Sequence, residues 1–123
     1  MDGQRFTPAD RLRHQREFQR VFQHGAKQAS PAFVLYVLPT SESHSRLGMA
    51  VSKRVGGAVV RNRIKRYIRE CFRRCKADLY PACDVVVVAR REAAELSYTK
   101  LSQHLLRLLR RCRRPAVLRQ RSG

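Results

Sequence analysis

The residues with the clearest chemical potential are basic side chains repeated at helical spacing between Ala58 and Arg74. At 100° per residue, apolar residues gather on one side of this segment, namely Ile64, Ile68, Cys71, Phe72 and Cys75. Polar and basic residues occupy the opposite arc: Asn62, Lys65, Arg66, Arg69 and Arg73. The pattern predicts a helix that buries one face and offers the other to an anion.

Folding alone does not explain the charge of this helix. Arg61 and Arg63 lie in its first turn, where each positive charge opposes the helix dipole at a cost of about 0.3 kcal/mol or more. Glu70 is the one acid on the charged face, so pairing within the helix cannot neutralise it. A solvated charged face is the ordinary interpretation of such a run. These two features favour phosphate binding instead.

Side chains that could cleave a phosphodiester bond do not come together in the sequence. The acids form no D-x-D or E-x-x-H pair of the kind that holds Mg²⁺, and there is no Walker-type loop. No histidine neighbours a plausible nucleophile. The four cysteines, at 71, 75, 83 and 112, match no common zinc spacing and are better interpreted as buried free thiols. The sequence therefore predicts no catalytic residues and no metal ligands.

Composition points to a polyanionic partner. The chain has 123 residues, enough for a single domain spanning 1–123, with an ordered core expected over about 12–112 and basic, flexible termini. Its formal net charge is +18, which favours nucleic acid as the partner. No apolar run approaches the ~20 residues that span a bilayer, and the N-terminus shows no signal-peptide core. A cytoplasmic protein with no membrane partner is expected.

The elements that must position the basic helix are short. Residues 1–11 are expected to be a loose lead-in, and a helix is predicted over about 13–23, ended by Gly25 as a left-handed cap. Strands are predicted over 33–38, 47–51 and 84–89, the last a central strand because its valines do not alternate with polar residues. Ser97 caps a final helix that Pro115 should end, leaving a mobile tail.

Aromatic rings offer a second kind of binding surface. Phe18 and Phe22 are one turn apart on the first helix, and Tyr36 lies on the first predicted strand. If that helix crosses the sheet on the Tyr36 side, the three rings line a shallow groove. Single-stranded nucleic acid binds such grooves by stacking, at ~1–3 kcal/mol per base and with little sequence preference. The alternative, that the rings belong to the core, stays open.

The order of these segments resembles the protein subunit of bacterial ribonuclease P. The resemblance rests on Phe18–Phe22 with Gly25, Phe33–Tyr36, Val51–Gly56, and Ala58–Arg66 followed by Arg69 and Glu70. It runs from about Leu12 to Arg110, and its most specific block is R-N-R-x-K-R-x-x-R-E.

The resemblance implies an α+β fold. The expected architecture is a small two-layer α/β sandwich in the order α-β-β-β-α-β-α, related to the second domain of a small-subunit ribosomal protein. It also implies a left-handed β-α-β crossover around the basic helix. Right-handed crossovers are the rule, so the residue pattern alone would not predict this feature.

The resemblance also implies a function within an endoribonuclease. A catalytic RNA subunit would remove the 5′ leader of precursor tRNA with Mg²⁺ held mainly by the RNA, and this chain would bind both RNAs and lower the Mg²⁺ requirement. Residues carried over as contacts to the catalytic RNA are Arg61, Asn62, Arg63, Lys65, Arg66 and Arg69. Residues carried over to the leader cleft are Phe18, Phe22, Tyr36 and Lys53. No obligate protein partner is expected.

Other functions stay open at this point. The leading alternative is a non-enzymatic RNA-binding protein, such as a ribosomal protein or RNA chaperone, which would use the same basic helix. A DNA-binding protein that inserts residues 61–74 into the major groove lacks a helix-turn-helix partner, because predicted strands flank the helix on both sides. A membrane-active basic protein fits poorly, because the helices have folded partners.

Overall fold

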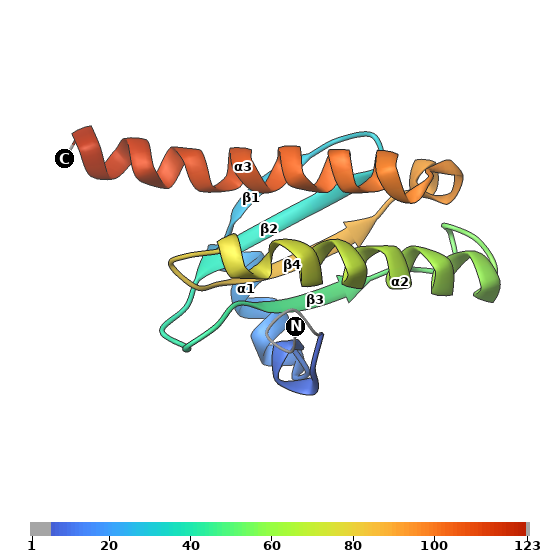
Figure 1. Cartoon of the computed structure of the whole chain (residues 1–123), viewed down its shortest axis with the longest axis horizontal. Helices are drawn as coiled ribbons and strands as arrows, with labels where there is room; N and C mark the ends of the chain where they lie inside the picture. Colours follow the sequence, from blue (N-terminus) through green and yellow to red (C-terminus); the bar gives the residue numbers. More distant parts are fainter. Residues whose placement is uncertain (1–5, 123) are drawn as a thin grey trace.

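The computed structural model describes the backbone of residues 6–122 and the side chains of residues 6–113. Within this range the chain has the expected order α-β-β-β-α-β-α (Figure 1). The helices and strands are α1 (Gln15–His24), β1 (Ala26–Ala29), β2 (Phe33–Pro39), β3 (Arg46–Ala50), α2 (Ala58–Cys75), β4 (Cys83–Ala89) and α3 (Tyr98–Ser122). Three short 3₁₀ segments accompany them: η2 (Pro8–Asp10), η3 (Lys76–Asp78) and η4 (Arg91–Glu95). The α+β class is confirmed.

The strands form one sheet in the spatial order β1-β2-β4-β3. β4 pairs antiparallel with β2 and parallel with β3, so Val85 lies opposite both Val37 and Leu47. The central position predicted for residues 84–89 is therefore confirmed, and it explains why apolar residues follow one another there. The sequence does not predict β1, because its four residues, AKQA, are too few and too polar to show a strand pattern.

β3, α2 and β4 form a left-handed crossover. Both strands run from left to right in Figure 1, α2 lies in front of them, and β4 lies above β3. A right-handed connection would place β4 on the other side of β3. The crossover that the resemblance implied is thus present, although about 98% of such connections have the opposite hand.

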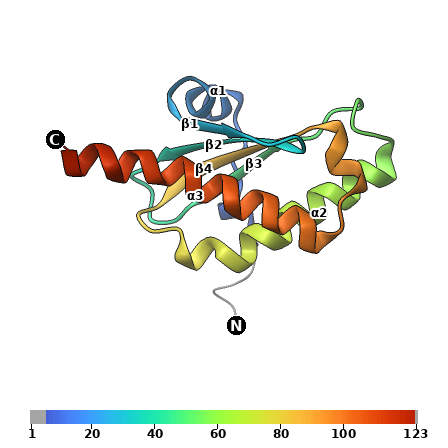
Figure 2. The same cartoon turned by 90° about the horizontal axis from the view of Figure 1, so that it is seen from above.

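Helices α2 and α3 cover one face of the sheet, and α1 crosses the other (Figure 2). The larger core lies under α2 and α3 and includes Phe33, Leu35, Ile64, Ile68, Leu101 and Leu108. α2 buries the face that its period predicted, through Ile64, Ile68, Cys71 and Phe72. Leu12, Val21 and Val86 form a smaller core under α1. No helix of the described residues is both long and apolar enough to cross a membrane.

Arg46 joins α1 to the sheet. Its guanidinium donates to both carboxylate oxygens of Asp84, at 3.0 and 2.9 Å, and to Glu17 Oε2 at 2.9 Å. The Asp84 side chain is only 4% exposed, so its charge needs this partner. Backbone N–H groups of His14 and Arg13, together with Arg46, hold the pKa of Glu17 below its usual range. One cation therefore connects β3, β4 and the first turn of α1.

The N-terminal segment is more ordered than the sequence analysis expected. Asp10 is buried and accepts hydrogen bonds from the Thr7 backbone N–H at 2.7 Å and from Lys76 Nζ at 2.9 Å. Arg11 forms a parallel bridge with Leu47. The prediction of a loose lead-in is wrong for residues 6–11, because a buried carboxylate and an added bridge to the sheet edge hold them.

Two predicted helix ends need correction. Gly25 follows α1 in extended backbone, with φ −75° and ψ 154°, because the chain passes directly into β1. A residue without a side chain is needed at this position, because a Cβ would lie 2.6 Å from the Val21 carbonyl oxygen. α3 does not end at Pro115 but continues to Ser122. A proline inside a helix removes one backbone hydrogen bond and destabilises the helix by about 3 kcal/mol. The N–H groups of the residues after it can still donate to helical carbonyls, so the helix can continue. Of the ends predicted to be flexible, residues 1–5 and 123 lie outside the described residues.

Arg46→Gln should destabilise the fold by about 3 kcal/mol, because it leaves the Asp84 charge buried without its partner. Urea denaturation followed by circular dichroism measures the loss. Arg74→Gln is the matched control: it breaks a more exposed pair with Glu70 and should cost at most about 1 kcal/mol. Equal stability of the two variants would contradict the role given to Arg46.

Candidate nucleic-acid interface

The cationic side of α2 begins at the glycine turn that follows β3. Gly57 caps the helix through its backbone, and its carbonyl accepts from the Arg61 N–H at 2.9 Å. The Arg61 side chain turns back and donates from Nε to the Gly56 carbonyl at 3.2 Å. That contact uses one N–H of the guanidinium and leaves its other donors for a partner.

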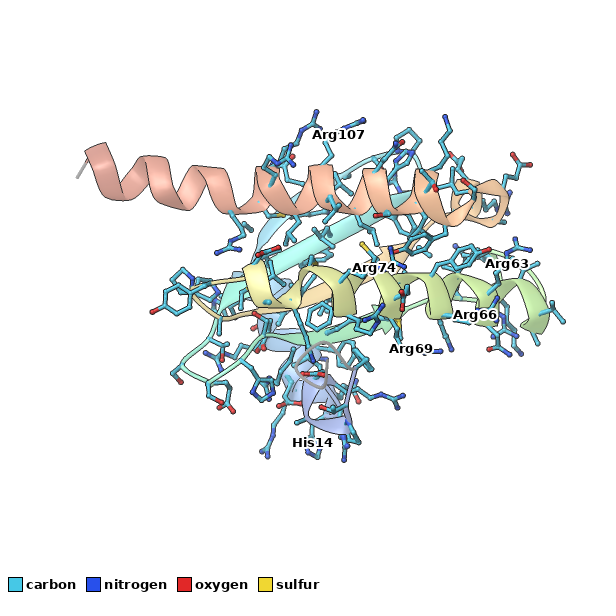
Figure 3. The ribbon with its side chains drawn as sticks, in the orientation of Figure 1. His14, Arg63, Arg66, Arg69, Arg74 and Arg107 are labelled. Carbon is cyan, nitrogen blue, oxygen red and sulfur yellow. The ribbon has the colours of Figure 1, made fainter. Side chains whose placement is uncertain are left out.

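The six predicted residues of α2 do not share a single face. Arg63 donates to the Ala94 carbonyl of η4 at 2.5 Å, so it leans toward the start of α3. Arg66 and Arg69 lie together on the side of the N-terminal segment, as Figure 3 shows. Asn62 and Arg66 are exposed, whereas the other four are half-buried: Arg61, Arg63, Lys65 and Arg69.

Arg66 and Arg69 line an open groove between α2 and the N-terminal segment. Its other lining residues include Phe6, Arg11, Tyr67 and Tyr98. The Arg66 guanidinium carbon lies 5.8 Å from the centroid of the Tyr67 ring. Burial, followed by the charges of Arg11 and Arg66, lowers the pKa of Arg69. Three cations are therefore held close together, and an anion in the groove would relieve their repulsion.

Glu70 does not neutralise this groove. Its carboxylate accepts from Arg73 at 2.6 Å and from Arg74 at 2.8 Å, and these contacts lower its pKa to about 2. The acid thus stays ionised near neutral pH and is already paired with the last turns of the helix. Arg66 and Arg69 have no ion pair with any carboxylate of residues 6–113.

The aromatic residues meet on the opposite face of the sheet, because α1 does cross it on the Tyr36 side. The rings of Phe22 and Tyr36 meet edge to face with centroids 4.9 Å apart. Phe22 is 40% exposed, which is unusual for a large apolar side chain and leaves its ring accessible. Phe18 lies deeper and covers Gly48, where a Cβ would come within 2.5 Å of its ring.

α1 covers only part of this sheet face. Val34, Ala50 and Val88 are half-buried, and strand alternation places them on the same face as Tyr36. They extend an apolar floor from the rings toward the end of β3. Lys53 is exposed in the turn that follows, between β3 and α2. In the sequence, Lys53 therefore lies between Tyr36 of the aromatic cluster and the cationic residues of α2.

Two cations of the interface were missed by the sequence analysis. Lys27 pairs with Tyr36 across β1 and β2, and its Nζ lies 5.7 Å from the Tyr36 ring centroid. Arg11 enters the groove of Arg66 and Arg69 from the N-terminal segment. No sequence pattern predicts either role, because β1 has no strand pattern and Arg11 lies in a segment without a recognisable helix or strand signal.

The described residues contain no group of three or more His, Cys, Asp or Glu side chains placed to hold a metal ion. The four cysteines are free thiols, and three of them are buried. What the geometry offers is therefore a cationic groove on one side of the sheet and exposed rings on the other, both suited to nucleic acid.

Comparison with known proteins gives consistent matches over this region. A model of the Ribonuclease P family matches residues 6–113. The ribonuclease P protein component of Geobacillus kaustophilus is 47% identical over 102 residues, covering 82% of this chain and 84% of that protein. A structure of a Staphylococcus aureus RNase P protein mutant with defective mRNA degradation activity has a TM-score of 0.77 at 38% identity, covering 83% and 86% of the two chains. The RNase P protein from Thermotoga maritima has a TM-score of 0.73 at 33% identity, covering 82% and 96%.

Pyrophosphate at low millimolar concentration should raise the melting temperature by about 4 °C at low salt, because a bound anion relieves the repulsion at Arg69. Arg69→Gln should lose at least half of this rise. Arg16→Gln, an exposed change on α1, should keep it in full. Differential scanning calorimetry measures all three proteins. Equal rises in the two variants would show that the anion binds elsewhere.

Proposed function

This chain belongs to the ribonuclease P protein component family, and we propose that it places two RNAs on its two faces. As a component of this endoribonuclease, it assists the RNA subunit, where catalysis resides, in 5′ processing of tRNA. In our proposal the cationic side of α2 binds the RNA subunit, and the aromatic cluster holds the 5′ leader of precursor tRNA. The observation that carries the proposal is the separation of these two surfaces by the sheet.

The α2 surface suits a phosphate backbone. Arg66, Arg69 and Arg11 form a cluster whose charge no neighbouring carboxylate cancels, and phosphates would replace the missing counter-charges. Arg61 and Arg63 each donate a hydrogen bond from the guanidinium to a backbone carbonyl of this chain. These bonds orient the remaining N–H donors of the two guanidinium groups before RNA binds. Asn62 and Lys65 complete the proposed set on the first turns of the helix.

The aromatic cluster suits an unpaired strand. Bases can stack on the exposed Phe22 ring and against Tyr36. Lys27, beside Tyr36, and Lys53, exposed in the turn after β3, would contact the backbone phosphates. Phe18 packs over Gly48, is less exposed than Phe22 and contributes less of its own surface. Because every base has a stacking face, such a cleft accepts leaders of different sequence.

The Mg²⁺ ions of the reaction would be held mainly by RNA in this proposal. The contribution of the protein is electrostatic: a chain of net charge +18 between two polyanions reduces the repulsion that Mg²⁺ would otherwise screen. The protein should therefore matter most when Mg²⁺ is scarce. A general RNA-binding protein or chaperone would bind the same RNAs without raising cleavage, and this difference separates the two functions.

Cleavage of precursor tRNA by a bacterial ribonuclease P RNA at low Mg²⁺ should rise strongly when this protein is added. Arg66→Ala with Arg69→Ala should remove most of the stimulation by weakening assembly, while circular dichroism shows an intact fold. Arg16→Ala with Arg20→Ala removes the same charge from exposed positions of α1 and should keep the stimulation. Tight RNA binding without stimulation would instead establish the chaperone function.

Phe22→Ala should weaken binding of precursor tRNA to the assembled enzyme about tenfold, because one stacked base contributes ~1–3 kcal/mol. Mature tRNA, which has no leader, should bind equally well to the variant and the parent protein. Tyr36→Phe keeps a ring and should behave as the parent does. If Phe22→Ala weakened the binding of precursor and mature tRNA equally, the aromatic cluster would not be the leader site.

A further inference from the structure

Among the described side chains of α3, every exposed charged residue is basic. No Asp or Glu follows Glu95 in the sequence, whereas Lys and Arg occur at positions 100, 107, 110, 111, 113, 114, 119 and 121. A helix that is charged only for solubility normally mixes both signs, because opposite charges one turn apart stabilise it. This helix has no acid with which to form such pairs.

Four of these cations form one patch. Leu101, Leu105, Leu108 and Cys112 are buried against the sheet. At 100° per residue, Lys100, Arg107 and Arg111 fall within about 40° of one another on the side away from that stripe. Arg110 lies next to them, and all four are exposed. Figure 3 shows Arg107 directed outward from the molecule. None of the four pairs with a carboxylate of residues 6–113.

The patch continues toward the cationic groove of α2. A second open groove, between α2 and α3, is lined by Arg74 from α2 and by Arg110 and Arg113 from α3. It shares Arg74 and Tyr98 with the groove that contains Arg66 and Arg69. Cationic side chains therefore extend across the whole helical layer, on the opposite side of the sheet from Phe22 and Tyr36 (Figure 2).

The chemistry of the patch selects a phosphate backbone as its partner. A helix that lies on a membrane has large apolar residues beside its cations to enter the lipid. On α3 the one large apolar side chain that is exposed among the described residues is Leu106, at 37%, and it lies on the α2 side of the helix. Guanidinium groups without an apolar border are suited to phosphate oxygens.

We propose that the exposed patch of Lys100, Arg107, Arg110 and Arg111 on α3 is a second binding surface for phosphates of the RNA subunit. This inference rests on the proposed function, because it assigns the whole helical layer, rather than α2 alone, to that RNA. An RNA segment that lies across α2 continues over the α2–α3 groove onto α3.

The salt dependence of assembly tests the proposal. The affinity of the protein for the RNA subunit, without tRNA, is measured by filter binding over a range of salt concentrations. Each displaced phosphate counterion contributes about 0.7–0.9 to the slope of log K against log salt. The triple variant Arg107→Gln, Arg110→Gln, Arg111→Gln should lower the slope by about 2. The control Arg13→Gln, Arg16→Gln, Arg20→Gln removes the same charge from exposed positions on α1 and just before it, and should leave the slope close to that of the parent.

The outcomes are distinct. Equal slopes for the α3 triple variant and the parent, or equal losses in both triple variants, would overturn the proposal. So would normal RNA binding by the α3 variant combined with lost binding to anionic phospholipid vesicles, since the patch would then belong to a membrane. The variant Arg66→Ala with Arg69→Ala tests α2 separately, so failure of the proposed function is recognised independently.

Photo-crosslinking places the contact directly. Gln103 is exposed beside Lys100 and Arg107 on α3, and Gln19 is exposed on α1. A benzophenone amino acid at position 103 should crosslink to the RNA subunit in the assembled complex, and the same group at position 19 should not. Absence of a crosslink from position 103, with assembly intact, would contradict the proposal.

Discussion

The three-way contact of Arg46 with Asp84 and Glu17 is the interaction on which both surfaces depend. It fixes the first turn of α1 to β3 and β4, and α1 carries Phe18 and Phe22 onto Tyr36. β3 and β4 also precede and follow α2 in the crossover, so their pairing determines where the cations of α2 lie. A shift of β3 against β4 would move the aromatic cluster and the cationic groove together. The relative placement of the two proposed RNA-binding surfaces is therefore set inside the sheet.

The few carboxylates of this basic chain are used to hold its structure. Asp84 and Glu17 bind Arg46, Asp10 binds Lys76, and Glu70 binds Arg73 and Arg74. Each of these contacts joins separate elements or steadies the end of α2. With 9 acids against 27 basic residues, the chain has too few carboxylates to pair with most of its cations. Four of the nine acids thus hold elements of the structure together, and the outer helical layer keeps a strongly positive field.

Much of this could be predicted from the sequence where the signal is local. The 3.6-residue period revealed both faces of α2, and the unbroken valines revealed a central β4. The hand of the crossover depends on how the elements pack together, and general rules favour the opposite hand. The contact between Arg46 and Asp84 joins residues 38 positions apart, and no sequence pattern predicts it. Lys27 was missed for a related reason, since its partner Tyr36 is defined only by the register of β1 and β2.

In the proposed function the two surfaces would bind RNA in ways that share one property. Stacking on Phe22 and Tyr36 accepts any base, and guanidinium contacts to phosphates accept any sequence. Neither kind of contact is the bidentate contact to a base edge on which sequence discrimination usually rests. In the proposed function the protein would recognise an unpaired strand and the course of its backbone, while catalysis resides in the RNA subunit. This division explains why exposed rings and unneutralised arginines, which a purely structural domain would avoid, are retained on opposite faces of one small sheet.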